Sequence, residues 1–246
     1  MIKVASYNIH KAVGTDRIRN PERILAVLHE IDADIVALQE ADRRFGARAA
    51  ILSPHHLADH SPWKAVSFGT RAPGAHSAGA HSPGARALSA GWHGNVLLVR
   101  KTANVADCAA IHLPTLEPRG AICADIALAG ATMRVVGMHL DLSGLWRRRQ
   151  ARAVLAHLDG KAGALPTIMM GDLNEWSRAA GCLGEFTRRF ALAPTGPSFH
   201  SRRPVARLDR IMTSPDLRVV SCGVHMSALA RQASDHLPIW ATIERR

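Results

Sequence analysis

The chain has 246 residues, 47% hydrophobic and 21% charged, and its 31 Lys and Arg against 20 Asp and Glu give a net charge of +11. That hydrophobic fraction excludes a disordered chain, and no collagen-like or heptad repeat is present. No run reaches the roughly 18–20 apolar residues of a membrane span, and residues 1–7 lead directly into an expected strand rather than a secretory signal. We therefore expect one cytoplasmic domain over residues 1–246, with no transmembrane segment and no evident obligate protein partner.

The basic excess is mostly arginine, because only five of the 31 basic residues are lysines. Guanidinium groups suit bidentate contacts with phosphate, so the charge favours a polyanionic partner. The alternative is a codon bias without functional meaning. Aromatic residues make up only 4% of the chain, with one tyrosine, which argues against binding a single strand through a platform of stacked bases.

The cysteines lie far apart and form no C-x-x-C pair, at positions Cys108, Cys123, Cys182 and Cys222. This spacing excludes a zinc knuckle, and a disulfide framework is not expected in a chain of this length. We expect small buried thiols in a reducing compartment.

Short apolar runs with β-branched residues predict buried strands at residues 2–9, 34–38, 96–99, 121–128, 133–140, 167–170, 208–212, 219–224 and 237–243. Helical periodicity predicts one helix beginning at Pro21 and another over about residues 146–158, with Arg147 and the arginines after it mostly on the polar face. Alternating strands and helices indicate an α/β sandwich.

Residues of about 71–90 interrupt this pattern. The segment is rich in Gly, Ala, Ser, Pro and His, and residues 74–78 are nearly repeated as 79–83. Without periodicity it should form a mobile surface loop. The alternative is that His76 and His81 bind a metal ion. The glycines beside them would make such a site poorly preorganised.

Pairs of polar residues two positions apart lie at the ends of three of the runs: Asn8 with His10, His139 with Asp141, and Asp172 with Asn174. Residues i and i+2 of a strand point to the same face, so each pair can project from the rim of a sheet. Further polar residues embedded in or flanking the runs are Glu40, Asp209, Asp235 and His236. Each residue alone is better explained as a turn cap or as a core residue with its hydrogen bonds satisfied. These structural roles do not explain why all of them occur together at strand ends.

The residue types in this set indicate a particular chemistry. Carboxylates inside apolar strands are costly unless they are paired, hydrogen-bonded or bound to a cation. Oxygen ligands without thiolates suit Mg²⁺ or Mn²⁺ better than structural zinc. Together with two histidines they predict metal-assisted attack of water on a phosphoester.

Seven short motifs occur in order along the chain: Ser6-Tyr7-Asn8-Ile9-His10, Leu38-Gln39-Glu40, Pro118-Arg119-Gly120-Ala121, Gly137-Met138-His139-Leu140, Gly171-Asp172-Leu173-Asn174, Arg207-Leu208-Asp209-Arg210-Ile211 and Ser234-Asp235-His236-Leu237-Pro238. Each is weak alone, but the series resembles the endonuclease/exonuclease/phosphatase superfamily, with its deoxyribonuclease-I-like nucleases, sphingomyelinases and inositol polyphosphate phosphatases. The resemblance implies a four-layer α/β sandwich of two packed mixed β-sheets flanked by helices, with the site at one rim.

The resemblance also implies roles for individual residues. Glu40 would be the principal ligand of Mg²⁺ or Mn²⁺, with Asn8 and Asp235 nearby. Asp172 would orient or deprotonate the attacking water, and Asn174 would hold water and phosphate.

The remaining implied roles concern the phosphate. His236, oriented by Asp209, would donate to the phosphoryl oxygens. His139 matches the second histidine of the family, as phosphate ligand or general acid. Arg119 matches an arginine that contacts phosphate in some branches, and His10 is a further candidate phosphate-binding residue.

The sequence also departs from parts of the family. Its only tyrosine is Tyr7, so the mid-chain tyrosine of the apurinic-endonuclease branch and the minor-groove tyrosine of deoxyribonuclease-I-like members have no counterpart. His93 and Asn95 are expected at the rim without an assigned role. Arginines cluster beside the motifs and predict a basic rim: Arg17, Arg19, Arg43, Arg44, Arg147, Arg148, Arg149, Arg202, Arg203, Arg207 and Arg210.

These observations lead to a divalent-metal-dependent phosphoester hydrolase, nuclease-like or phosphodiesterase-like, acting on a polyanionic substrate such as nucleic acid. The main alternative is a phosphoesterase for phospholipid or phosphoinositide head groups. A non-catalytic phosphate- or nucleic-acid-binding protein on the same fold is a third reading, which the intact motif positions oppose.

Overall fold

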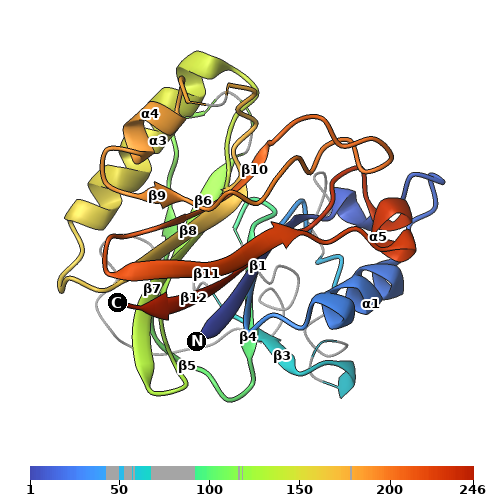
Figure 1. Cartoon of the computed structure of the whole chain (residues 1–246), viewed down its shortest axis with the longest axis horizontal. Coiled ribbons are helices and arrows are strands. Elements are labelled where there is room, and N and C mark those ends of the chain that lie inside the picture. The colour runs from blue at the N-terminus through green and yellow to red at the C-terminus, as the bar shows by residue number, and fades with distance from the viewer. Residues whose placement is uncertain are drawn as a thin grey trace, which may run out of the picture.

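The structure is a computed structural model that describes residues 1–42, 50–52, 57, 59–67, 92–115, 117, 119–177 and 179–246. The loop expected at about 71–90, with His76 and His81, lies outside the described residues. Two mixed sheets of six strands each are packed face to face and flanked by helices (Figure 1). The α/β sandwich expected from the sequence is confirmed.

The first sheet has the strand order β11-β12-β1-β2-β4-β3. These strands are β11 (Leu217–Val224), β12 (Ile239–Arg245), β1 (Ile2–Asn8), β2 (Ile35–Gln39), β4 (Val96–Arg100) and β3 (Trp63–Ala65). Only β1 and β2 run parallel, with Asn8 paired to Gln39 at their ends. The other neighbours in this sheet are antiparallel.

The second sheet has the order β5-β6-β7-β8-β10-β9. Its strands are β5 (Asn104–Ile111), β6 (Gly120–Leu128), β7 (Ala131–His139), β8 (Thr167–Asp172), β10 (Asp209–Thr213) and β9 (Ala191–Leu192). Here β7 and β8 form the parallel pair, ending at His139 opposite Asp172. Each sheet therefore has one parallel pair whose carboxyl ends carry the polar motifs.

Three apolar layers hold the sandwich together. The central layer joins the sheets through residues such as Val4, Ile35, Val135 and Ile211. Outside the first sheet lie α1 (Pro21–Ile31) and α5 (Ala228–Ala233), and outside the second lie α3 (Gly144–Asp159) and the short α4 (Leu183–Phe186) (Figure 1). No described helix has the length and apolar character needed to cross a membrane.

The first expected helix forms as α1, and its local sequence explains why. Asn20 caps it by accepting a hydrogen bond from the backbone N of Arg23 at 3.0 Å, and Pro21 occupies the first turn. Its apolar residues at helical spacing are all buried: Ile24, Leu25, Val27, Leu28 and Ile31.

The second expected helix forms as α3, but one detail of the prediction was wrong. Arg147 does not face solvent; it is only 7% exposed and lies 3.3 Å from Glu175. Arg148 and Arg152 on the same helix are exposed, as expected. An ion-pair partner on another segment thus draws one arginine inward, which helical periodicity does not encode.

The nine expected strands all form, but no apolar run predicted β3, β5 or β9. The longest of these, β5, is an edge strand with mostly exposed or half-buried side chains, so its residues show no apolar run. Of the four cysteines, all unpaired, Cys123 and Cys182 are buried as expected, whereas Cys108 and Cys222 are only half-buried.

The approach of β7 to β8 requires glycine at position 171. A side-chain Cβ there would lie 1.9 Å from the backbone oxygen of Met138, the residue paired with Gly171. Because backbone atoms cannot move aside as a flexible side chain can, Gly171 fixes the strand pair that carries His139 and Asp172.

We expect Gly171→Ala to lower the free energy of unfolding by about 2–3 kcal/mol, the upper part of the range for overpacking. Gly184→Ala is the matched control, because an added Cβ at position 184 in α4 meets no atom within 4 Å. Alanine there should be neutral or slightly stabilising. Urea unfolding followed by far-UV circular dichroism measures both, and equal effects would contradict the steric explanation.

Candidate functional site

The polar motifs meet at one rim of the sandwich. Asn8 ends β1, His139 ends β7 and Asp172 ends β8, while Asp209 begins β10 directly opposite Asp172. His236 precedes β12, which runs antiparallel to β1, so it reaches the same rim from the other direction. Strand direction therefore gathers residues from both sheets.

The centre of the site is the carboxylate of Asp172, which is only 1% exposed. Its Oδ2 accepts a hydrogen bond from Asn8 Nδ2 at 3.0 Å and lies 3.5 Å from His139 Nε2 and 3.7 Å from His236 Nε2. Its Oδ1 accepts from the backbone N of Asn174 at 2.9 Å. The carboxylate is thus held on both oxygens.

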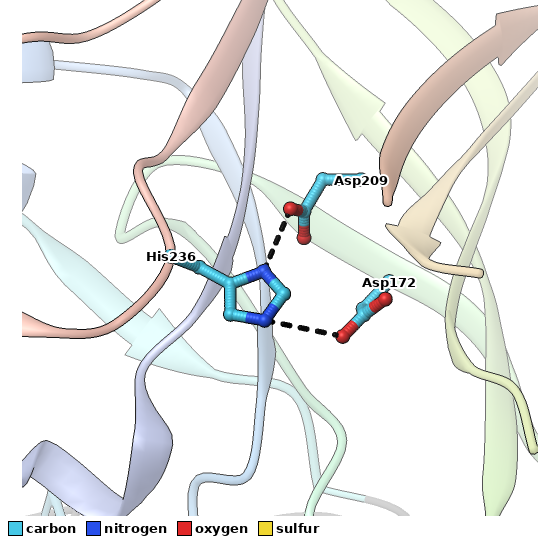
Figure 2. Close-up of side chains that lie close together, drawn as sticks. All are labelled: Asp172, Asp209 and His236. Carbon is cyan, nitrogen blue, oxygen red and sulfur yellow. Dashed lines mark hydrogen bonds and ion pairs between the residues drawn. The ribbon is translucent and has the colours of Figure 1, made fainter. Parts of the chain in front are cut away.

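His236 lies between two carboxylates, as Figure 2 shows: Nδ1 is 2.8 Å from Asp209 Oδ2, and Nε2 faces Asp172. Ser198 Oγ donates a hydrogen bond to the same oxygen of Asp209. Burial lowers the pKa of His236, but the charges of Asp209 and Asp172 outweigh it and raise the pKa to about 10. His236 is therefore an imidazolium at neutral pH.

His139 has the opposite electrostatic character. Burial lowers its pKa, Asp172 opposes that effect, and the positive charge of Arg119 reinforces it, leaving the pKa at about 4. Arg119 Nη1 lies 3.0 Å from His139 Nδ1. His139 is therefore neutral at pH 7, with a permanent cation beside it.

The predicted metal ligands lie around the short turn after β1. Glu40 pairs with the ammonium of Lys11, Asn8 Oδ1 accepts a hydrogen bond from the backbone N of His10 at 3.1 Å, and Asp235 Oδ1 lies 3.8 Å from His10 Nδ1. Burial raises the pKa of Glu40, but the cationic form that His139 takes in acid, together with the hydrogen bond and the charge of Lys11, outweighs it and holds the pKa at about 2. Its carboxylate is ionised at neutral pH.

A second set of potential metal-ligating atoms, different from the predicted one, lies close together at the rim. In the described part of the chain, one group of His, Cys, Asp and Glu side chains brings three ligand atoms within 4.8 Å of one another: Asp172, Asp209 and His236. Within this group, His236 Nδ1 is hydrogen-bonded to Asp209 Oδ2, whereas its Nε2 forms an ion pair with Asp172 Oδ2 at 3.7 Å. The three oxygen-bearing side chains predicted as metal ligands, Glu40, Asn8 and Asp235, instead each contact the turn after β1.

Asn174 and Asn95 are placed mainly by hydrogen bonds to backbone oxygens. Asn174 Nδ2 donates to the backbone oxygen of Leu140 at 2.9 Å, and Asn95 Nδ2 donates to that of Gly120 at 3.0 Å. Asn95 is fully buried, so it braces the start of β6 behind Arg119. His93 packs edge-on against Trp92, with ring centroids 4.6 Å apart.

The expected basic rim is only partly found. Arg119 contacts His139 directly. Arg147 forms an ion pair with Glu175, and Arg148 and Arg152 form ion pairs with Glu185. Arg17, Arg19, Arg202, Arg203 and Arg207 are exposed, and Arg210 is buried. Arg43, Arg44 and Pro118 lie outside the described residues.

Several residues of the site were not anticipated from the sequence. Lys11 adjoins the Asn8 motif and could have been suspected, as could Glu175 beside Asn174. Ser198 and Phe199 lie in a segment without apolar periodicity, so nothing local indicated them. Phe199 lies against His236 with ring centroids 4.9 Å apart, and the two residues form an isolated β-bridge.

The chain is similar to known proteins over nearly its whole length. The model of the Endonuclease/Exonuclease/phosphatase family matches residues 5–236. No curated protein sequence matches the chain. Among solved structures, mannosyl-6-phosphatase Bt3783 of Bacteroides thetaiotaomicron has 18% identity and a TM-score of 0.75, with 99% of this chain and 100% of that chain covered.

Two further solved structures are similar over almost the whole chain. The human Nocturnin catalytic domain with bound sulfate has 20% identity and a TM-score of 0.72, covering 100% of this chain and 94% of that one. D. rerio TDP2 complexed with a single-strand DNA product has 17% identity and a TM-score of 0.70, covering 99% and 98%. At these identities the likeness concerns the fold.

In metal-free protein we expect His236 to stay protonated through pH 8, because its pKa is raised to about 10. The folded pKa lies above the unfolded value of about 6.5, so this stabilisation is complete below about pH 6.5 and is lost as pH rises toward 10. Asp209→Asn should lower the pKa, since Asp209 contributes the largest charge effect. Imidazole ¹⁵N shifts in EDTA-treated protein test this, and titration near pH 6.5 in the wild type would contradict it.

Proposed function

The chain belongs to the endonuclease/exonuclease/phosphatase family, and we propose that it is a divalent-metal-dependent phosphoester hydrolase that cleaves a phosphodiester in a polyanionic substrate. The observation that carries this proposal is the convergence of Asn8, His139 and His236 on one buried oxygen of Asp172. A carboxylate fixed in this way can orient a water molecule and accept its proton. The cationic donors beside it face the charge that develops on a phosphoryl group.

Glu40, Asn8 and Asp235 are the proposed ligands of Mg²⁺ or Mn²⁺. Their donors are hard oxygens, and the Glu40 carboxylate is ionised at neutral pH. The buried thiols of Cys123 and Cys182 do not compete, because burial raises the pKa of both to about 12. When bound, the ion would polarise the phosphoryl oxygens and favour ionisation of water.

Asp172 is the proposed base. Its Oδ1 is fixed by the backbone of Asn174 and its Oδ2 by Asn8, so the carboxylate cannot turn away from a water molecule at the rim. The side chain of Asn174 is itself anchored to Leu140 and would help to hold the water and the phosphate.

His236 is the proposed donor to the phosphoryl oxygens. Asp209 binds Nδ1 and leaves Nε2 directed at the Asp172 side of the site, where the phosphate would lie (Figure 2). Arg119 supplies a second fixed positive charge, with His10 as a further polar contact. Because the pKa of His139 is lowered to about 4, we assign it as a neutral phosphate ligand rather than a general acid.

An exposed aromatic side chain suggests what adjoins the scissile phosphate. Trp176, which follows Asn174 by two residues, is 66% exposed and lies edge-on to Phe199, with ring centroids 6.2 Å apart. Phe199 in turn packs against His236. This pair offers one stacking position rather than a platform, and it favours a substrate with a planar ring such as a nucleobase.

We expect hydrolysis of bis-p-nitrophenyl phosphate with Mg²⁺ or Mn²⁺, its loss in EDTA, and a fall in kcat of about 10²–10⁴-fold in Asp172→Asn, the range for removing a general base. Asp159→Asn is the matched control, because Asp159 is an exposed carboxylate at the end of α3 that pairs with Arg189. It should retain full activity.

Two results would overturn the proposal. Activity that survives both EDTA and Asp172→Asn would exclude the assigned metal-dependent site. Binding of a polyanion with steep salt dependence, but without turnover of any substrate, would identify a non-catalytic binding protein.

The substrate assignment is tested with two esters that share p-nitrophenolate as leaving group: thymidine 5′-(p-nitrophenyl phosphate) and p-nitrophenylphosphorylcholine. Stacking on one base contributes about 1–3 kcal/mol, so Trp176→Ala should raise KM for the thymidine ester about tenfold and leave the choline ester unchanged. Trp146→Ala on α3 is the control. A wild-type preference for the choline ester, with no effect of Trp176→Ala, would instead favour a head-group phosphoesterase.

A further inference from the structure

Arg210 differs from the other buried arginines of the protein. Within the described residues these are Arg119, Arg134, Arg147 and Arg210. Arg134 binds Asp125 through two hydrogen bonds of 2.8 and 2.9 Å, and Arg119 and Arg147 each lie 3.3 Å from a glutamate. Arg210 forms no ion pair with any described carboxylate, although it is only 5% exposed.

The sole hydrogen bond found for the Arg210 side chain within the described ranges is from Nη1 to the backbone oxygen of Asp209, at 3.2 Å. Burial lowers its pKa, and the charge of Asp209 only partly offsets this effect. A buried guanidinium without a counter-ion is costly, and proteins normally pair such groups. The guanidinium group of Arg210 therefore has N–H donors without a partner among the described residues.

A cavity of about 180 Å³ adjoins this side chain. Arg210 and Arg207 both line it, together with Thr195 and Gly196. The charge of Arg207 lowers the pKa of Arg210 further, which means that the two cations repel each other across the cavity. Arg207 is exposed and likewise lacks an ion pair to the described part of the chain.

The cavity is rigidly connected to the candidate site. Arg210 directly follows Asp209, which binds His236, and both belong to β10. The cavity wall near Thr195 is tied to the same strand, because the backbone N of Ala193 donates to the oxygen of Ile211 at 2.9 Å. A ligand here would lie beside the site, on the other face of β10 from Asp209.

We propose that this cavity binds a phosphate group, held by the guanidinium groups of Arg207 and Arg210 with the hydroxyl of Thr195 in reach. Two guanidinium groups in one cavity match the charge and the bidentate geometry of phosphate. On the proposed function, the natural source is a second phosphate of the polyanionic substrate, next to the one that is cleaved. Free phosphate has the same chemistry and is the other source.

Inorganic phosphate alone, added to EDTA-treated protein, tests binding independently of catalysis. We expect thermal stabilisation of the wild type by phosphate, and a smaller stabilisation of both Arg207→Met and Arg210→Met. Arg188→Met is the control of equal charge, since that side chain is 76% exposed, pairs with Glu185 and does not line the cavity. Equal phosphate stabilisation in all four proteins would overturn the proposal.

The unliganded variants give a second readout. Because Arg210→Met removes an unpaired buried charge, it should unfold no more easily than the wild type without phosphate. Should Arg210→Met fail to fold, the exposed Arg207→Met decides the matter by the same phosphate measurement.

The source of the phosphate is decided by kinetics. Arg210→Met should raise KM for a short oligonucleotide about tenfold, the loss expected for a hydrogen bond to a charged group, and leave KM for the single-phosphate bis-p-nitrophenyl phosphate unchanged. An effect on phosphate stabilisation without an effect on KM would assign the cavity to free phosphate. Inactivity of the wild type toward every substrate would refute the proposed function, while the phosphate measurement would still decide the cavity.

Discussion

The site depends on a hydrogen bond between the two sheets at their shared rim: Asn8 Nδ2 donates to Asp172 Oδ2 at 3.0 Å. Asn8 ends a strand of the first sheet and Asp172 a strand of the second, 164 residues later. The contact exists only if the central apolar layer sets both sheets at the right separation and Gly171 lets β8 approach β7. Core packing and site geometry are therefore a single constraint, because a shift of either sheet would separate the donors from the carboxylate.

The two histidines beside Asp172 show how surroundings divide chemical roles between identical side chains. Both are buried, which disfavours the charged form. His236 has two carboxylates in contact and becomes a cation, whereas His139 has one carboxylate and the permanent charge of Arg119, and stays neutral. The site thus presents an imidazolium and a neutral imidazole beside the same oxygen of one carboxylate, and Ser198 and Phe199 hold the charged ring in place.

The many arginines of this protein occupy several kinds of structural position. Only some of them lie where a substrate could contact them. Arg134 and Arg147 bind carboxylates inside the protein, and Arg147 links the turn after β7, through Leu142, to Glu175 in the loop after β8. These two segments carry Asp141 and Asn174, so the contacts of Arg147 join two parts of the rim. Arg119 contacts His139 and pairs with Glu117, whereas Arg207 and Arg210, which line a cavity beside the site, have no ion pair within the described residues. The net charge alone therefore overestimates how many arginines can contact a substrate. Burial and ion pairing decide which guanidinium groups are available for such a contact.

The sequence by itself determined the strands and helices with strong periodicity and the residues at their ends, because apolar runs such as residues 133–140 and capped helices such as α1 are encoded by neighbours in the chain. The sequence also identified the polar residues of the seven motifs, from Asn8 to His236, as candidate site residues. Only the tertiary structure decided that Arg147 turns inward, that β5 forms at an exposed edge, and that Ser198 reaches Asp209. Each of these depends on a partner distant in the sequence, whose position follows from packing the two sheets and leaves no periodic trace in the chain.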